Sequence, residues 1–355
     1  MPERLIKNFA AATGLLVLLA ALCLAGCAAS RPAAPAAPDR EIAWPAPAAS
    51  PRIEWLGAFR GAEDLGLNKG LWSRMRSFMT GEELPFLVRP YGIDAQADAP
   101  LFIADTGGAR VHLIDLQRRR HEVVAGSEEL LFRSPIDLAR DGRGHLYITD
   151  SALGAILRYD LKKEVLTRFA ATGLKRPTGI AYAPQQALLY VADAQAHQVV
   201  AFDLNGAERR RFGMRGSAAG QFNFPTALSV AGNGDLLVTD ALNFRIQRFA
   251  ADGRFLSAFG QAGDALGHFS RPKGVALDSA GNVYVCDAEL DTVQIFNDSG
   301  QLLLNFGTKG NGPGQFLMPT GIFIDERDTI YVADSYNQRI QIFRFIDHDR
   351  TPIEK

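Results

Sequence analysis

The segment Met318–Phe343, MPTGIFIDERDTIYVADSYNQRIQIF, constrains the fold most strongly, because its arrangement recurs five times upstream. It opens with Pro319, which fixes φ and breaks helices. Three short alternating segments follow, separated by polar turns, and the second of them ends in Asp334. Alternation of apolar and polar residues over four to eight positions indicates half-buried strands. Each copy of the segment therefore predicts a small antiparallel sheet.

The six copies follow one another at a nearly constant interval. Their prolines are 45, 42, 48, 47 and 47 residues apart; they are Pro90, Pro135, Pro177, Pro225, Pro272 and Pro319. The aspartates that close the second strand keep the same interval; they are Asp105, Asp150, Asp193, Asp240, Asp287 and Asp334. One such sheet cannot bury both of its faces, so the copies must stack around an axis. The sequence predicts an all-β, six-bladed β-propeller.

Composition narrows the classes of partner. The chain of 355 residues has a formal net charge of −1, and its Lys and Arg residues are scattered. Nucleic-acid binding requires a concentrated basic surface, so we expect no nucleic-acid partner. The Gly-rich links Gly263–Phe269 and Gly310–Phe316 enter strands rather than helices. They therefore lack the helix N-terminus of a phosphate-binding loop, and we expect no cofactor.

Residues 1–26 have the composition of a secretory signal. Arg4 and Lys7 form a positive start, and Ala10–Ala25 is almost entirely apolar. The apolar run is short for a membrane span and is followed by small residues, as in cleaved signals. Alternatives are an uncleaved signal anchor, or an ordinary signal peptide with a chance Cys27.

The signal ends in Leu24-Ala25-Gly26-Cys27, which resembles the bacterial lipobox, whose Cys becomes the lipid-modified first residue. The resemblance implies that Cys27 is the lipid attachment site and, with Ala28 after it, that the protein lies at the outer membrane facing the periplasm. Residues 27–51 are rich in Ala and Pro and are predicted to be an extended tether.

Cysteine usage agrees with this interpretation. Cys23 is removed with the signal and Cys27 is acylated, so Cys286 has no partner for a disulfide. Cys286 occupies the strand position that Ala104, Ala192 and Ala333 hold in other copies. We expect it to be a small core residue rather than a nucleophile.

The propeller is expected to span residues 52–346, followed by a tail at 347–355. The sixth copy has no outer strand of its own, whereas Ile53–Phe59 resembles such a strand. We expect Trp55–Phe59 to close the ring, because an open array would expose strand edges. An insertion at about 60–88 contains Gly70–Thr80, predicted to be a short basic helix that either packs on the propeller or faces a partner or membrane.

The repeated pattern resembles the NHL repeat and, more broadly, NHL/TolB-like propellers. The motif is clearest in Gly274-Val275-Ala276, Val283–Asp287, Asn243-Phe244-Arg245-Ile246 and Asn337-Gln338-Arg339-Ile340. The resemblance covers Trp55 to Phe345 and implies the fold. It does not decide function, because propellers of this type include ligand-binding domains, enzymes and partner platforms.

A metal-dependent hydrolase or lyase is the main alternative to a binding protein. Zinc chemistry needs about three ligands at matching depths in the channel, and no three of the six His share a repeat position. We expect each of them to be a surface or loop residue; they are His112, His121, His145, His197, His268 and His348. The repeated Asp residues are candidate calcium ligands, but their presence in every blade favours hydrogen-bond anchors for the following loop. No metal site is assigned.

One end of the ring is the candidate binding face. In propellers the residue after each Pro and the loop after each Asp lie at the same end, and Arg and aromatic residues are favoured in binding hot spots. The candidates are Tyr91, Arg110, Thr178, His197, Thr226, Asn243, Phe244, Arg245, Lys273, Thr320, Tyr336, Asn337 and Arg339, with Ile136 beside them. Alternatively, Arg245 and Arg339 pair with the repeated Asp inside the blade.

These observations together favour a lipid-anchored, non-catalytic propeller of the bacterial cell envelope. Its expected partners are the membrane, through the lipid, and a protein or small ligand on one face of the ring.

Overall fold

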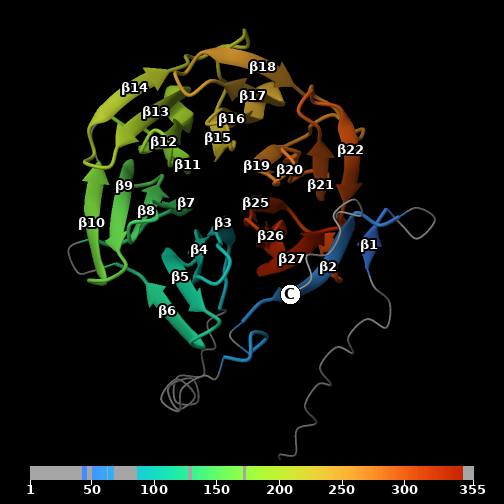
Figure 1. Cartoon of the computed structure of the whole chain (residues 1–355), viewed down its shortest axis with the longest axis horizontal. Helices are drawn as coiled ribbons and strands as arrows, with labels where there is room; N and C mark the ends of the chain where they lie inside the picture. The colour runs from blue at the N-terminus through green and yellow to red at the C-terminus, as the bar shows by residue number, and fades with distance from the viewer. Residues whose placement is uncertain are drawn as a thin grey trace, which may run out of the picture. The chain divides into compact units, whose positions relative to one another are not determined.

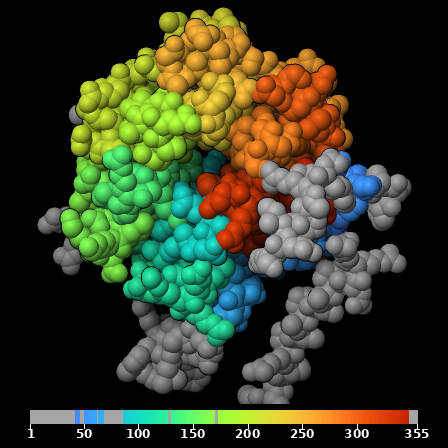
Figure 2. Space-filling model, viewed as in Figure 1, coloured from blue at the N-terminus to red at the C-terminus, as the bar shows by residue number. Residues whose placement is uncertain are grey.

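The computed structural model describes residues 42–45, 50–61, 63–67, 86–126, 130–170 and 173–346. These residues form six antiparallel sheets arranged as blades of a ring, each with its first strand nearest the axis (Figure 1). The space-filling view shows the blades packed side by side around a central hollow (Figure 2). The six predicted blades are confirmed.

The first five blades each contain four strands. The first blade comprises β3 (Pro90–Asp94), β4 (Leu101–Asp105), β5 (Arg110–Asp115) and β6 (Arg120–Val124). The second comprises β7 (Pro135–Arg140), β8 (His145–Asp150), β9 (Ala155–Asp160) and β10 (Val165–Ala170). The third comprises β11 (Pro177–Ala183), β12 (Leu188–Asp193), β13 (Gln198–Asp203) and β14 (Glu208–Phe212). The fourth comprises β15 (Pro225–Val230), β16 (Leu236–Asp240), β17 (Arg245–Phe249) and β18 (Phe255–Phe259). The fifth comprises β19 (Pro272–Leu277), β20 (Val283–Asp287), β21 (Thr292–Phe296) and β22 (Leu302–Phe306).

The sixth blade combines the two ends of the described chain. It contains β25 (Pro319–Ile324), β26 (Thr329–Asp334), β27 (Arg339–Phe345), β2 (Ile53–Phe59) and β1 (Ala43–Trp44). Strand β2 pairs antiparallel with β27, so that Trp55 lies opposite Phe343 and Phe59 opposite Ile340. The predicted closure by an N-terminal strand is confirmed, and the strand begins two residues earlier than expected.

Strand β1 departs from the expected tether. The sequence predicts an extended tether as far as residue 51, but Ala43 and Trp44 pair with β2 as a fifth strand. The Trp44 ring lies 5.8 Å from that of Phe306 and 5.9 Å from that of Phe343. A tryptophan buries a large apolar area, which outweighs the Ala/Pro character of its neighbours.

Several predicted segments lie outside the described residues: the signal at 1–26, Cys27, the proposed helix Gly70–Thr80 and the tail at 347–355. Within the described ranges, helical structure consists of three single turns, η1 (Ala194–Ala196), η2 (Ala241–Asn243) and η3 (Ser335–Asn337). None of these described helices is long and apolar enough to cross a membrane. Two short strands, β23 (Thr308–Lys309) and β24 (Gln315–Phe316), pair in the link before the sixth blade.

The hydrophobic core lies between neighbouring blades rather than within them. In one cluster, Tyr190 and Val199 of the third blade pack with Leu236, Val238 and Phe249 of the fourth. The predicted small core residue Cys286 is fully buried in the cluster shared by the fifth and sixth blades. Stability of the ring therefore depends on every interface between blades.

Four of the six innermost strands have glycine at their third residue, where the next blade approaches closely. A Cβ added to Gly92 would lie 2.6 Å from the Cα of Asp137 on the next blade. A Cβ on Gly321 would clash with the carbonyl oxygen of Tyr91, where the last blade meets the first. This close approach explains the glycine of the repeated Pro-x-Gly motif.

The repeated aspartates fix the links between blades. All six are fully buried. In the third blade, Asp193 accepts the backbone N–H groups of Lys175 at 2.8 Å and Arg176 at 2.9 Å, just before Pro177. The N–H of Ala194 in turn donates to the carbonyl of Arg176 at 3.0 Å. The predicted role as hydrogen-bond anchors is confirmed. These bonds place the links and the loops after each Asp at one end of the ring, called here the proline end.

Candidate functional site: the central channel

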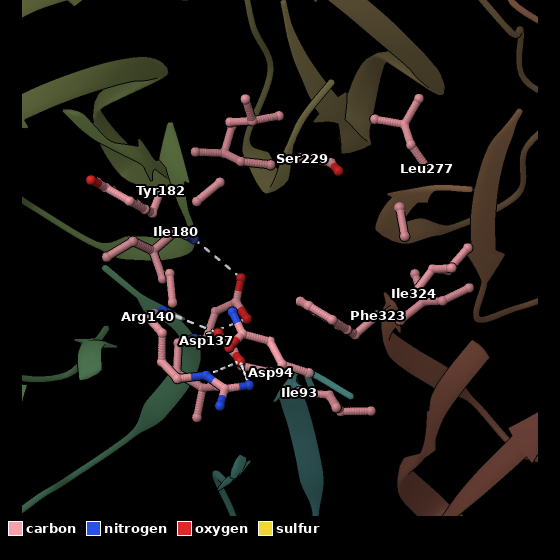
Figure 3. A pocket seen from close by; sticks show the side chains of 18 of the residues that line it. Ile93, Asp94, Asp137, Arg140, Ile180, Tyr182, Ser229, Leu277, Phe323 and Ile324 are labelled. Atoms are coloured by element: carbon pink, nitrogen blue, oxygen red, sulfur yellow. Dashed lines mark hydrogen bonds and ion pairs between the residues drawn. The ribbon is translucent and has the colours of Figure 1, made fainter. Parts of the chain in front are cut away.

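A cavity of about 450 Å³ occupies the channel at the opposite end of the ring, called here the cavity end. It is lined by the second halves of all six innermost strands (Figure 3). The fourth residue of each innermost strand is a branched apolar residue that contributes to the wall and is otherwise buried between blades: Ile93, Leu138, Ile180, Leu228, Val275 and Ile322. Tyr182, Leu277, Phe323 and Ile324 add further apolar surface. Concave spaces of this size, with apolar side chains and a few polar groups in the wall, are typical of small-molecule sites.

Asp137 is the exceptional residue in this wall. The equivalent third residue of the other innermost strands is Gly or Ala: Gly92, Gly179, Ala227, Gly274 and Gly321. The Asp137 carboxylate accepts the N–H of Leu138 at 3.0 Å. It also accepts the N–H of Ile180, on the next blade, at 3.1 Å (Figure 3). No cationic side chain of the described residues forms an ion pair with it.

The environment of Asp137 favours its protonated form. Burial raises the pKa of this carboxyl to about 7, against the two backbone hydrogen bonds, which act to lower it. Its side chain is only partly buried because it still faces the cavity. A carboxyl group with this pKa can accept a hydrogen bond from a ligand, or donate one, near neutral pH.

A second carboxylate in the wall, Asp94, is neutralised within the protein. Arg140 donates its backbone N–H to Asp94 at 3.0 Å and its Nε at 2.5 Å. The same guanidinium donates to the Pro100 carbonyl at 3.2 Å and lies 5.0 Å from the centre of the Phe102 ring. These contacts occupy Asp94 and Arg140, so Asp137 is the carboxyl group of the wall that remains available to a ligand, beside the polar side chains of Gln96 and Ser229.

The cavity is not at the end where the sequence predicts the binding face. The candidate residues lie at the proline end, and several of them are engaged in contacts within the blades. Asn243, Arg245 and Gln247 all donate to Asp240, at 2.8, 2.8 and 3.0 Å. In the sixth blade the same network joins Asn337, Arg339 and Gln341 to Asp334. Arg245 and Arg339 therefore pair with the repeated Asp inside the blade, which is the alternative interpretation of these two residues.

Four other candidates are also held inside the structure. The Thr178 hydroxyl donates to the carbonyls of Ala192 and Pro225, both at 3.3 Å. Thr320 is buried and shares a 2.6 Å hydrogen bond with Ser335. His197 accepts the N–H of Phe224 at 3.2 Å, and Arg110 pairs with Asp105 at 3.3 Å. The candidates that remain at least partly accessible are Tyr91, Thr226, Phe244, Lys273 and Tyr336, with Ile136 beside them.

His112 differs from the surface or loop position expected of it, whereas His197 lies in the loop between η1 and β13, as expected. His112 is buried in the first blade, where its Nδ1 lies 3.0 Å from Nε2 of His121 and its Nε2 lies 3.5 Å from Asp105. Burial, then His112 and Arg110, lower the pKa of His121 to about 4. His197 is also buried, by its contact with Phe224. Among the described residues no group of three His, Cys, Asp or Glu side chains is arranged to hold a metal ion.

Comparison with known proteins agrees with this geometry. A family model described as "SMP-30/Gluconolactonase/LRE-like region" matches residues 87–259, and one described as "6-bladed beta-propeller" matches residues 268–349. The chain is a six-bladed β-propeller protein. The two matches together cover part of every blade.

Solved structures with the same fold have different functions. An auxiliary nutrient binding protein from Bacteroides thetaiotaomicron shares 15% identity, with a TM-score of 0.60 over 75% of this chain and 71% of that one. Virginiamycin B lyase from Staphylococcus aureus shares 16%, with a TM-score of 0.56 over 73% and 96%. A putative gluconolactonase shares 14%, with a TM-score of 0.58 over 82% and 94%. At these identities the likeness shows the fold alone, so function must be argued from the site.

Sequence reasoning missed the cavity and Asp137. It placed the binding face at the end of the ring that carries the residue after each Pro and the loop after each Asp, whereas the cavity is formed largely by strand residues that resemble core. The sequence signal was the departure of Asp137 from the Pro-x-Gly motif. An ionisable side chain at a position close to the axis, where most repeats have glycine, indicates a functional role.

Proposed function

We propose that this six-bladed propeller is a lipid-anchored binding protein of the bacterial cell envelope, which holds a small ligand in its central cavity without transforming it. The observation that carries the proposal is the cavity itself, with an apolar wall from all six blades and one available carboxyl, Asp137. The anchor part of the proposal rests on the lipobox at Cys27.

The wall defines the chemistry of the ligand. Its apolar side chains fit an apolar part of a ligand, and Asp137 fits a hydrogen-bond donor such as an amine or hydroxyl group. Because Asp137 is held by Leu138 and Ile180 on two blades, its position is fixed before the ligand arrives, and the cost of ordering the site is small.

The experiment is a screen of small apolar fragments that carry an amine, a hydroxyl, a carboxylate or a phosphate, followed by ligand-observed NMR with the purified full chain. Ser229 lies in the cavity wall (Figure 3), so Ser229→Phe should fill the space and abolish binding. Ser257, exposed on the outermost strand β18, supplies the matched control Ser257→Phe, which should bind normally. If no fragment binds in a manner sensitive to Ser229→Phe, the cavity is not the binding site.

The same experiment separates binding from catalysis. A bound fragment recovered unchanged supports a binding protein, whereas a fragment recovered as a product makes the protein an enzyme. Stoichiometric Zn²⁺ or Ca²⁺ retained after dialysis would support the metal-dependent hydrolase or lyase instead.

A further inference from the structure

At the proline end of the ring, the residue immediately before the repeated proline is arginine in every second blade. The residue immediately before each proline is, in ring order, Arg89, Ser134, Arg176, Phe224, Arg271 and Met318. The three arginines, called here the pre-proline arginines, belong to the first, third and fifth blades. Their backbone N–H groups donate to Asp105, Asp193 and Asp287 at 2.7, 2.9 and 2.9 Å. The blade aspartates thus hold three cationic residues at matching positions around the axis.

The guanidinium groups of these arginines are not neutralised by close carboxylates. Arg89 lies over the ring of Tyr336, 5.4 Å from its centre. Arg271 approaches Glu289 only to 3.9 Å, and both side chains are more than half exposed. No Asp or Glu of the described residues forms an ion pair with Arg176. An exposed ion pair at 3.9 Å is weak, so all three charges are available to a ligand.

Lys273 adds a fourth positive charge inside the same mouth of the channel. It is the second residue of β19 and is partly buried. Burial, then Arg271 and Arg176, lower the pKa of Lys273 to about 8. Arg176 belongs to the third blade and Lys273 to the fifth, so charges from separate blades act on each other across this mouth.

Two residues with hydroxyl groups, Tyr91 and Thr226, occupy the position of Lys273 on other innermost strands. Burial, then Asp137 and Cys286, raise the pKa of Tyr91 on the first blade, while Arg271 and Arg176 act to lower it. Thr226, on the fourth blade, has a buried Oγ1 with no hydrogen-bond partner among the described residues. An unsatisfied buried hydroxyl costs free energy unless a ligand supplies the missing bond.

We propose that the proline end of the channel binds a small anion with at least two negative charges, held by the pre-proline arginines and Lys273. Like charges gathered at one mouth repel one another, and a multivalent anion on the axis removes that repulsion. Arginine forks fit the paired oxygens of phosphate and carboxylate groups, which makes phosphate esters and polycarboxylates the chemical class. The site is separate from the cavity and does not depend on the function proposed for it.

The test is calorimetric titration of the full chain with pyrophosphate and, separately, citrate at low ionic strength. We expect one site per chain for at least one of these probes. Arg176→Gln and Arg271→Gln should each weaken binding about tenfold, since a hydrogen bond to a charged group contributes at least that factor. Arg254, exposed in the turn between β17 and β18, supplies the matched control Arg254→Gln, which should bind as the unaltered chain does. The backbone bonds to the aspartates are unaffected by these changes, so the variants should melt at the same temperature.

The outcomes separate this site from alternatives. Binding of pyrophosphate alone or of citrate alone assigns the phosphate or the carboxylate class, and either result supports the site. Failure of both probes to bind at about 10 mM, where a specific charged site should saturate, overturns it. An equal loss in Arg254→Gln shows a general charge effect and also overturns it. Loss of anion binding in the cavity-filling variant Ser229→Phe would place the anion in the cavity, against the proposal.

Discussion

The indole N–H of Trp55 donates to the side-chain oxygen of Gln341 at 3.0 Å, across the junction of β2 and β27. The side-chain amide of Gln341 in turn donates to Asp334 at 3.0 Å and to the carbonyl of Gln315 at 2.6 Å. The N-terminal strand is thereby joined to the hydrogen-bond network of the last blade as well as to its backbone. Strand β2 therefore closes the ring through backbone pairing with β27 and through the side-chain bond of Trp55 to Gln341.

Removal of apolar side chains from β2 should therefore destabilise the whole ring. Phe59 is 2% exposed, and Phe59→Ala should lower the free energy of unfolding by about 3–5 kcal/mol. Leu56, which is 45% exposed on the same strand, supplies the control, and Leu56→Ala should change it by less than about 0.5 kcal/mol. Urea denaturation of both variants measures the difference. A chain truncated to begin at Gly61 that melts at the same temperature as the full chain would contradict this role of β2.

The close approach at the junction of the last and first blades leads to a second stability prediction. Gly321→Ala places a methyl group against the Tyr91 carbonyl, and the required backbone shift should cost about 1–3 kcal/mol. Gly57, on β2, has no atom within 4 Å of an added Cβ and has no positive φ. Gly57→Ala should therefore be neutral or slightly stabilising. Equal melting temperatures for the two variants would contradict the prediction, because they would show that β25 and β3 can move apart to accept the methyl group at little cost in free energy.

The repeat made the ring predictable, and the limits of the prediction have physical causes. The spacing of the prolines and of the aspartates required six equivalent sheets, and the missing outer strand of the sixth copy indicated where Ile53–Phe59 must pair. Trp44 was missed because two strand residues within an Ala/Pro-rich segment leave no periodic pattern. Asp137 and the pre-proline arginines can be read from the aligned repeats, but their position beside the channel follows only from the closed ring.

The candidate face illustrates a further limit of sequence reasoning. Its loop position and residue types were inferred from the repeat, but the role of Arg245 and Arg339 was left open between ligand binding and pairing with the repeated Asp, because arginine serves both. Arg339 is 4% exposed and satisfied by Asp334. An arginine used in packing differs from one available to a ligand in the number of acceptors around its guanidinium group. That number depends on three-dimensional contacts, which the sequence does not show.

The proposed anchor predicts a change of cellular fraction without a change of fold. Cys27→Ser removes the acylated thiol and should shift the protein from the membrane to the soluble fraction, because one lost lipid anchor removes the main membrane affinity. Fractionation in high salt, with immunodetection, measures the shift. Ser30→Ala, three residues into the expected tether, is the matched control and should remain with the membrane. Membrane association of Cys27→Ser in high salt would show that acylation is not what retains the protein.

The raised pKa of Asp137 predicts how stability depends on pH. The folded protein holds this proton up to about pH 7, whereas the unfolded chain releases it near the ordinary value of 3.8. Between pH 3.8 and about pH 7 the unfolded state therefore binds fewer protons than the folded state. The contribution of Asp137 to stability is greatest below the pKa of the unfolded chain and is lost as the pH rises through the pKa of the folded protein. A pKa raised this far corresponds to at most about 4 kcal/mol. Solvent in the cavity screens the charge, so we expect about 1–2 kcal/mol.

Asp137→Asn should remove this dependence. The free energy of unfolding of the variant, relative to the unaltered chain, should rise by about 1–2 kcal/mol between about pH 5 and pH 8. Asn also removes one acceptor for the N–H groups of Leu138 and Ile180. The free-energy cost of that loss is the same at both pH values, so it does not contribute to the difference between them. Asp264, exposed in the link before the fifth blade, supplies the control Asp264→Asn. Urea denaturation at the two pH values decides the matter. If the two variants show the same dependence on pH, Asp137 is ionised throughout this range and its carboxylate, rather than its protonated form, faces the cavity.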